Sequence, residues 1–83
     1  MERITIFGRP GCGFCVRAKQ LCETQNLDHR YIDIHAEGIT KADLEKTVGK
    51  PVETVPQIFC GQKHIGGYTE FAAFISEAQS SAQ

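Results

Sequence analysis

The sequence predicts an α/β fold: a four-stranded mixed sheet with three helices that cover both of its faces. Two observations support this. Short runs rich in β-branched and aromatic residues alternate with segments whose apolar residues recur at helical spacing, in the order βαβ, α, ββ, α. The first three elements form a strand–helix–strand unit, and the last two strands form a hairpin, so the sheet should contain parallel and antiparallel pairs.

Length and composition limit the chain to one globular domain. Its 83 residues are 41% hydrophobic and 23% charged, the balance of an ordinary globular chain rather than a disordered one. A chain of this size buries roughly 60–65% of its unfolded surface, enough for two layers around one core. We therefore expect a single domain over residues 1–83, with a polar tail at residues 79–83.

The charge balance excludes two classes of partner. Nine basic and ten acidic residues give a formal charge of −1, and the pI is about 6.3. This is neither the basic footprint of a nucleic-acid-binding protein nor a polybasic membrane anchor.

No apolar run reaches the roughly 18–20 residues that span a bilayer, and residues 1–3 open no secretory signal, so we expect a cytoplasmic protein. There, the four cysteines would be reactive or metal-binding thiols rather than structural disulfides.

The first half of the chain contains a strand, a helix and a second strand. Residues 4–7 are a β-rich run, ended by Gly and Pro at residues 8–11. From residue 13 to about residue 25, one helical face carries the apolar residues Cys15, Ala18, Leu21 and Cys22. Residues 31–34 alternate as a second strand.

The second half begins with a helix whose start and end are both marked. Thr40 is placed to cap the amide of Asp43, and Asp43 occupies the position of the reciprocal partner in a capping box. Gly49 and Pro51 end this helix.

A hairpin and a final helix complete the chain. Residues 57–60 and 63–65 are strand-like runs around Gly61-Gln62, a Gly-X pair suited to a primed turn. Thr69 is predicted to cap the last helix, whose i, i+3, i+4, i+7 positions are Phe71, Phe74, Ile75 and Ala78.

The Cys-Gly-Phe-Cys motif at residues 12–15 carries most of the functional information. Positions i and i+3 of a first helical turn fall near the Cα–Cα range of about 4.4–6.8 Å that a disulfide needs. Cys12 ends a strand-to-helix loop, where free amides and the helix dipole stabilise an anion, and Arg9 and Arg17 add positive charge nearby. Helix N-termini thereby increase the thiolate fraction of a cysteine. We expect Cys12 to be the attacking thiolate, and Cys15 to be the more buried resolving thiol.

Other interpretations of the two cysteines remain open at this point. They could be structural, or they could form half of a zinc site that Cys60 and His64, at Cys-x3-His spacing, would complete. Cys60, however, follows Pro56 by four strand residues, or about 13 Å at ~3.3 Å per residue. If Pro56 lies near Cys12, Cys60 is too far away.

The remaining cysteines, histidines and charged helix residues are assigned structural roles. Cys22 lies about 15 Å along the helix from Cys12, beyond disulfide reach, and is interpreted as a core residue. Cys60 is interpreted as a small apolar strand residue. Surface or turn positions are predicted for His29, His35 and His64, and a solvated helix face for Lys41, Glu45 and Lys46.

Three separated motifs together resemble those of the small bacterial dithiol glutaredoxins, a family of the thioredoxin-like superfamily. The motifs are residues 9–15 (Arg-Pro-Gly-Cys-Gly-Phe-Cys), 54–57 (Thr-Val-Pro-Gln) and 66–71 (Gly-Gly-Tyr-Thr-Glu-Phe), and the match runs from Ile4 to about Ala78. The resemblance implies a thioredoxin-like fold and a monomeric, glutathione-dependent thiol–disulfide oxidoreductase. It also implies the clients: ribonucleotide reductase and oxidised or glutathionylated proteins.

The resemblance further implies where glutathione binds. Glutathione is a short extended peptide with two carboxylates, so its site needs backbone pairing and two anion-binding positions. By resemblance, Val55, before a cis Pro56, pairs with the cysteinyl part. The amides of Thr69 and Glu70 receive the γ-glutamyl carboxylate, and Arg9 faces the glycyl carboxylate. The full implied set is Arg9, Phe14, Thr54, Val55, Pro56, Gly67, Tyr68, Thr69 and Glu70.

The sequence departs from the family pattern at two places. Gly13-Phe14 stands where dithiol members commonly have Pro-Tyr, and Glu70 replaces the more usual Asp. Gly13-Phe14 resembles instead the monothiol Cys-Gly-Phe-Ser members, so the alternative function is a carrier or sensor that binds a [2Fe-2S] cluster through Cys12, between two protomers. The presence of Cys15 and of the Thr-Val-Pro sequence favours the enzyme. A redoxin served by thioredoxin reductase would lack the glutathione-binding segment at residues 66–69.

Overall fold

The computed structural model describes residues 2–81, which form four strands and three helices. In chain order these are β1 (Ile4–Gly8), α1 (Gly13–Thr24), β2 (His29–Asp33), α2 (Lys41–Val48), β3 (Gln57–Cys60), β4 (Lys63–Gly66) and α3 (Tyr68–Ser81). This is the predicted element order. Within the described part of the chain, no helix is both long enough and apolar enough to cross a membrane.

The strands form one mixed sheet in the order β2-β1-β3-β4. β1 pairs in parallel with β2, as the intervening α1 crossover requires, and antiparallel with β3; β3 and β4 form the hairpin. Ile4, at the start of β1, is opposite both His29 and Cys60. The mixed sheet predicted from the sequence is therefore confirmed.

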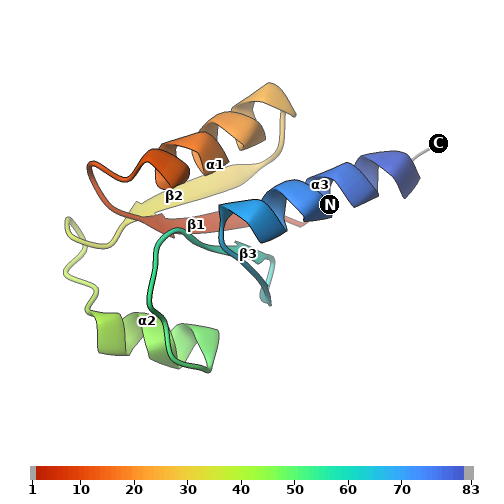
Figure 1. The fold of residues 1–83 in the computed structure, drawn as a ribbon. Helices are drawn as coiled ribbons and strands as arrows, with labels where there is room; N and C mark the ends of the chain where they lie inside the picture. The colour runs from red at the N-terminus through yellow and green to blue at the C-terminus, as the bar shows by residue number, and fades with distance from the viewer. Residues whose placement is uncertain (1, 82–83) are drawn as a thin grey trace.

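The main core lies between the sheet and the pair α1 and α3. In Figure 1, α1 lies on one side of the sheet and α2 on the other. Alternate residues of β1 are buried, as expected for a strand with one face turned to a packed layer. The core cluster consists of Ile4, Ile6, Ala18, Cys22, Ile58, Phe71 and Ile75, with Phe74 packed partly against it.

α2 begins with the predicted capping box. The Thr40 hydroxyl accepts from the Asp43 amide, and the Asp43 carboxylate accepts from the Thr40 amide, both at 3.1 Å. The hydrogen bond from the Thr40 amide, and secondarily the Thr40 side chain, holds the pKa of the Asp43 carboxyl below its ordinary value. Gly49 ends the helix with a φ of +87°, a left-handed conformation that glycine adopts without strain.

One expectation for the α2 surface is wrong. Glu45 is not simply a solvated residue, because its carboxylate accepts a hydrogen bond of 2.9 Å from the amide of Val52. Val52 is buried, so this contact ties the irregular segment after α2 to the helix. A carboxylate seven residues earlier in the chain satisfies an amide that belongs to no strand or helix.

Three element boundaries differ from the sequence predictions by more than one residue. β2 begins at His29, because pairing with β1 recruits two residues before the apolar run. α3 begins at Tyr68, so Thr69 lies inside the helix and is not its cap; Gly67 precedes the helix, and its carbonyl accepts from the Phe71 amide. α3 continues through residues 79–81, which the sequence assigns to a polar tail, and residues 82–83 lie outside the described residues.

Candidate active site

The loop between β1 and α1 places Cys12 at the N-cap of α1. Gly11, with a φ of +76°, turns the chain, and Cys12 is extended, with φ −96° and ψ 109°. The carbonyl of Cys12 accepts the first helical hydrogen bond, from Val16 at 3.2 Å. Cys12 therefore occupies the position usually taken by Ser, Thr or Asp, whose side chains cap free amides.

Cys12 and Cys15 form a disulfide in this structure, with their Cα atoms 5.2 Å apart. The amide nitrogen of Cys15 lies 3.2 Å from the Cys12 Sγ atom. Cys12 is half-buried, whereas Cys15 is fully buried. The predicted pairing and the predicted difference in burial are both confirmed.

Gly8, the last residue of β1, allows the first turn of α1 to approach the sheet. A Cβ atom at Gly8 would lie 3.0 Å from the Cβ of Cys15 and 2.8 Å from the Cζ of Tyr31. The Tyr31 hydroxyl donates to the carbonyl of Arg9 at 3.4 Å, which connects β2 to the loop before Cys12. A larger residue at position 8 would displace either Cys15 or Tyr31.

The loop before β3 lies against the exposed side of the disulfide. The Val55 carbonyl oxygen is 3.7 Å from the Cys12 Sγ atom, and the Val55–Pro56 peptide bond is cis, as the family resemblance implies. Residues 54–56 therefore lie beside the sulfur that the sequence predicts to react.

A groove of about 270 Å³ runs from this loop to the start of α3. Its lining contains every residue of the implied glutathione set except Arg9: Phe14, Thr54, Val55, Pro56, Gly67, Tyr68, Thr69 and Glu70. Phe14 is 54% exposed and forms one wall, with its ring 6.0 Å from that of Tyr68. The Arg17 guanidinium lies 5.4 Å from the centre of the Phe14 ring and adds positive charge at the edge.

The end of β4 turns sharply into α3 at the far side of the groove. Gly66 has a φ of +128°, a conformation that side chains disfavour. A Cβ atom at Gly67 would lie only 3.7 Å from the carbonyl oxygen of Pro56, so the two segments approach closely. The Glu70 carboxylate accepts from the Gly67 amide at 3.3 Å, whereas the amides of the first helical turn have no partner within the helix.

Arg9 is exposed and lies outside the groove. It lines a neighbouring pocket of about 280 Å³, which shares Thr54 and Val55 with the groove and also contains Lys41. The structure thus places Arg9 on the other side of the Val55 backbone from Tyr68 and Glu70. That arrangement separates the two candidate positions for the carboxylates of an extended ligand.

Comparison with known proteins identifies the family. The family model described as Glutaredoxin matches residues 4–65. The chain belongs to the glutaredoxin family. It is 70% identical, over 77 residues, to glutaredoxin 1 of Salmonella typhimurium, covering 87% of this chain and 88% of that relative.

Solved structures agree with this assignment. The NMR structure of reduced Escherichia coli glutaredoxin superposes with a TM-score of 0.84 at 55% identity, covering 94% of this chain and 98% of the other. The crystal structure of a buckwheat glutaredoxin–glutathione complex gives a TM-score of 0.74 at 28% identity, covering 90% of this chain and 69% of that one. This glutaredoxin is therefore a thiol–disulfide oxidoreductase with a thioredoxin-like fold, as the sequence predicts.

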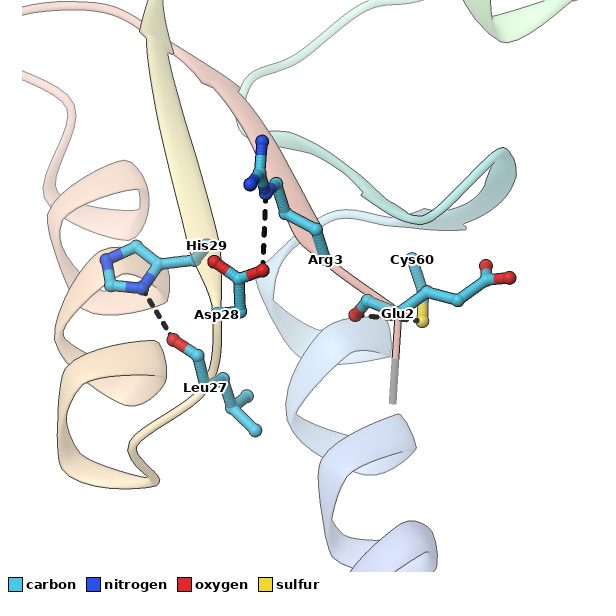
Figure 2. Close-up of polar contacts among 6 residues, drawn as sticks. All are labelled: Glu2, Arg3, Leu27, Asp28, His29 and Cys60. Atoms are coloured by element: carbon cyan, nitrogen blue, oxygen red, sulfur yellow. Dashed lines mark hydrogen bonds and ion pairs between the residues drawn. The ribbon is translucent and has the colours of Figure 1, made fainter.

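The zinc site considered from the sequence is not formed in this glutaredoxin. Cys60 is opposite Ile4 at the start of β1, whereas Cys12 follows the end of that strand. The Cys60 sulfur lies 3.9 Å from the carbonyl oxygen of Glu2 (Figure 2). Within residues 2–81 no three or more His, Cys, Asp or Glu side chains are grouped so as to hold a metal ion.

Cys22 and His35 have the structural roles expected of them. Cys22 is fully buried in the core; burial, and secondarily the nearby charge of Glu23, raises the pKa of its thiol to about 11. His35 lies exposed in a turn, whereas His29, expected at the surface or in a turn, is half-buried at the first position of β2 and bonds to the carbonyl of Leu27 at 2.9 Å.

One contact near the groove is absent from the sequence predictions. His64, expected at the surface, is half-buried, and its Nε2 atom lies 2.8 Å from Oε1 of Gln57. The available signal was a glutamine in an otherwise apolar strand, directly after the Thr-Val-Pro segment. Sequence spacing alone does not reveal its partner, which comes from the neighbouring strand.

Proposed function

We propose that this glutaredoxin reduces protein disulfides and glutathione mixed disulfides at the expense of glutathione, with Cys12 as the nucleophile. One observation carries the proposal: the Cys12 sulfur, at the N-terminus of α1, lies beside a groove that ends at the first turn of α3. The buckwheat relative, whose structure is a complex with glutathione, supports glutathione as the occupant.

The chemistry follows from thiolate exchange. The Cys12 thiolate attacks one sulfur of the substrate disulfide, which forms a mixed disulfide and releases a substrate thiolate that takes up a proton. The Cys15 thiolate then attacks the Cys12 sulfur, which releases the second substrate thiol and gives the Cys12–Cys15 disulfide. One glutathione thiolate opens this disulfide at Cys12, and a second removes the bound glutathione as glutathione disulfide. When the substrate is itself a glutathione mixed disulfide, Cys12 alone suffices.

The geometry supports different roles for the two cysteines. The Cys15 amide, 3.2 Å from the Cys12 Sγ atom, stabilises negative charge on that sulfur. Because Cys15 is fully buried, an incoming thiol reaches the disulfide at Cys12. This arrangement directs glutathione to the sulfur that lies beside the groove.

Glutathione would lie along the groove as an extended peptide. The Val55 backbone would pair with its cysteinyl part, in the manner of an added strand. The free amides of Thr69 and Glu70 would bind the γ-glutamyl carboxylate, and Arg9 would attract the glycyl carboxylate from the neighbouring pocket. Phe14 and Tyr68 would form the side walls, with Thr54, Pro56 and Gly67 completing the surface.

The clients we propose are disulfide-bearing or glutathionylated proteins, with ribonucleotide reductase among them. We propose that the protein acts on them as a monomer in the cytoplasm. The half-buried Cys12 and the exposed Phe14 leave the disulfide accessible to such a partner.

A glutathione-coupled assay tests the proposal. Reduction of a small mixed disulfide is followed through glutathione reductase and NADPH. We expect the turnover rate to saturate with glutathione and to be abolished in Cys12→Ser. Absence of glutathione-dependent turnover in the wild-type protein would refute the proposal. The [2Fe-2S] alternative, in which Cys12 would be this chain's ligand to the cluster, is tested by an absorption spectrum of freshly purified protein. We expect no visible absorption band.

A further inference from the structure

Gln57 is a buried polar residue at the edge of the groove. Its side chain is at the first position of β3, directly after Pro56, and the residue is only 8% exposed. Both ends of its amide are used: Nε2 donates to the carbonyl of Thr54 at 2.8 Å, and Oε1 lies 2.8 Å from Nε2 of His64. These bonds join β4 to the loop beside Cys12.

Hydrogen-bonding chemistry fixes the direction of both contacts. The Thr54 carbonyl can only accept, so the NH₂ group of Gln57 must face it, and the amide oxygen must face His64. His64 must then carry a hydrogen on Nε2. Burial, and secondarily the nearby charge of Lys50, lowers the pKa of His64, whereas Glu70 raises it by a smaller amount. The lowered pKa favours the neutral ring. The single N–H of that neutral ring is committed to Gln57.

The packed sheet holds His64 in place. Its ring lies 5.1 Å from that of Phe59, which is buried and packs edge-to-face on Phe7 at 5.8 Å. The loop that receives the Gln57 bond belongs to no strand or helix over residues 51–56. Its other contacts include the bond from the Val52 amide to Glu45 and the approach of the Val55 carbonyl to Cys12. The order of Thr54 and Val55 therefore depends on side-chain contacts such as this one.

We propose that His64 and Gln57 are positioning residues for glutathione: they hold the Thr54 carbonyl, and thereby the Val55 backbone, in the geometry that pairs with the ligand. The inference rests on the proposed function. Binding by backbone hydrogen bonds is weaker when the protein segment that supplies those bonds must first become ordered. A loop that is already fixed therefore lowers the glutathione concentration needed for turnover.

Two variants of His64 separate hydrogen bonding from packing. His64→Phe keeps an aromatic ring against Phe59 but removes the donor, whereas His64→Gln keeps an N–H at about the same reach. The KM for glutathione should rise about five- to tenfold in His64→Phe and less than about twofold in His64→Gln, as expected for one lost hydrogen bond. The kcat at saturating glutathione and the alkylation rate of Cys12 should stay within about twofold of wild type in both.

A third variant changes Gln57, the residue that contacts the Thr54 carbonyl. Gln57→Glu keeps an oxygen for His64 but turns a second carboxylate oxygen toward the Thr54 carbonyl, which repels it. The KM for glutathione should rise further than in His64→Phe. Circular dichroism and thermal unfolding verify that each variant is folded.

A measurement on the wild-type protein completes the test without any substitution. Nitrogen-15 NMR of the His64 ring should show the hydrogen on Nε2; a hydrogen on Nδ1 instead would overturn the inference. So would equal KM increases in His64→Phe and His64→Gln, or a wild-type KM in His64→Phe. If the wild-type protein itself shows no glutathione-dependent turnover, the proposed function fails, and this inference fails with it.

Discussion

The amide nitrogen of Cys15 lies 3.2 Å from the Sγ atom of Cys12, although the two residues are also disulfide partners. The same N–H group is therefore in place to stabilise the Cys12 sulfur when the disulfide opens and leaves a negative charge on it. The cysteine side chain does here what a serine or aspartate does at an ordinary N-cap. From this relationship we expect the two cysteines to differ in reactivity.

Serine variants should separate the roles of the two cysteines. Cys12→Ser should lose all turnover, because none of the other cysteines in residues 2–81 occupies a helix N-cap. Cys15→Ser should still reduce glutathione mixed disulfides, which need one thiolate, but should lose reduction of many protein disulfides. Both are measured with matched small and protein substrates. Equal losses in the two assays for Cys15→Ser would contradict the assignment.

Arg9→Glu should raise the KM for glutathione, because the new carboxylate repels a carboxylate of the ligand. Arg9 is exposed in a loop, so the fold should be unaffected. Arg30→Glu, at an exposed position of the edge strand β2, makes the same change of charge away from the groove and serves as the control. If the two variants have the same KM, Arg9 does not contribute to binding.

Gly13→Pro should stabilise the fold by about 0.4–1 kcal/mol, because proline restricts the unfolded chain. Gly13 is the first residue of α1, where proline is favoured, and a Cβ there meets no atom within 4 Å. Cys12 already has the extended backbone that a residue before proline requires. Urea unfolding measures the difference, and a loss of stability would show that the Gly13 amide has a structural partner.

In the [2Fe-2S] alternative, the same substitution should suppress cluster binding on anaerobic reconstitution while sparing the disulfide chemistry.

Asp43 should make the stability of the protein depend on pH in the acidic range. Because its folded pKa lies below the ordinary value, its contribution is fully present above about pH 4 and disappears as pH falls through the folded pKa. Asp43→Asn should therefore be less stable than wild type at neutral pH, with the difference vanishing in acid. Asp28→Asn, at an exposed ion pair, is the control; a pH-independent difference for Asp43→Asn would refute the capping account.

The elements with local signals were the ones that the sequence predicted well. The capping box at Thr40, the stop at Gly49 and the bounds of β3 depend on neighbouring residues, and the structure confirms them. The start of β2 depends on pairing with β1, so the apolar pattern at residues 31–34 could not reveal it. Glu45 was misassigned for the same reason, since its partner Val52 lies beyond the end of the helix.

The candidate site was predicted mainly through family resemblance rather than residue spacing. Helix geometry alone brought Cys12 and Cys15 together, because they lie one turn apart. The approach of Val55 to Cys12 and of Gly67 to Pro56 depends on the three-dimensional arrangement of separate segments. The contact between Gln57 and His64 was missed because it depends on the register of the β3–β4 hairpin, which is irregular between Ile58 and Phe59.

We expect the N-terminus of α1 to make Cys12 the reactive thiolate of this glutaredoxin. The most direct test is the alkylation rate of each cysteine in the reduced protein as a function of pH, followed by peptide mass spectrometry. The Cys12 rate should reach half its maximum below about pH 7. Cys22, whose thiol has a pKa of about 11, should stay unmodified. A half-maximal rate for Cys12 near pH 8.5, the value of an ordinary thiol, would contradict the account.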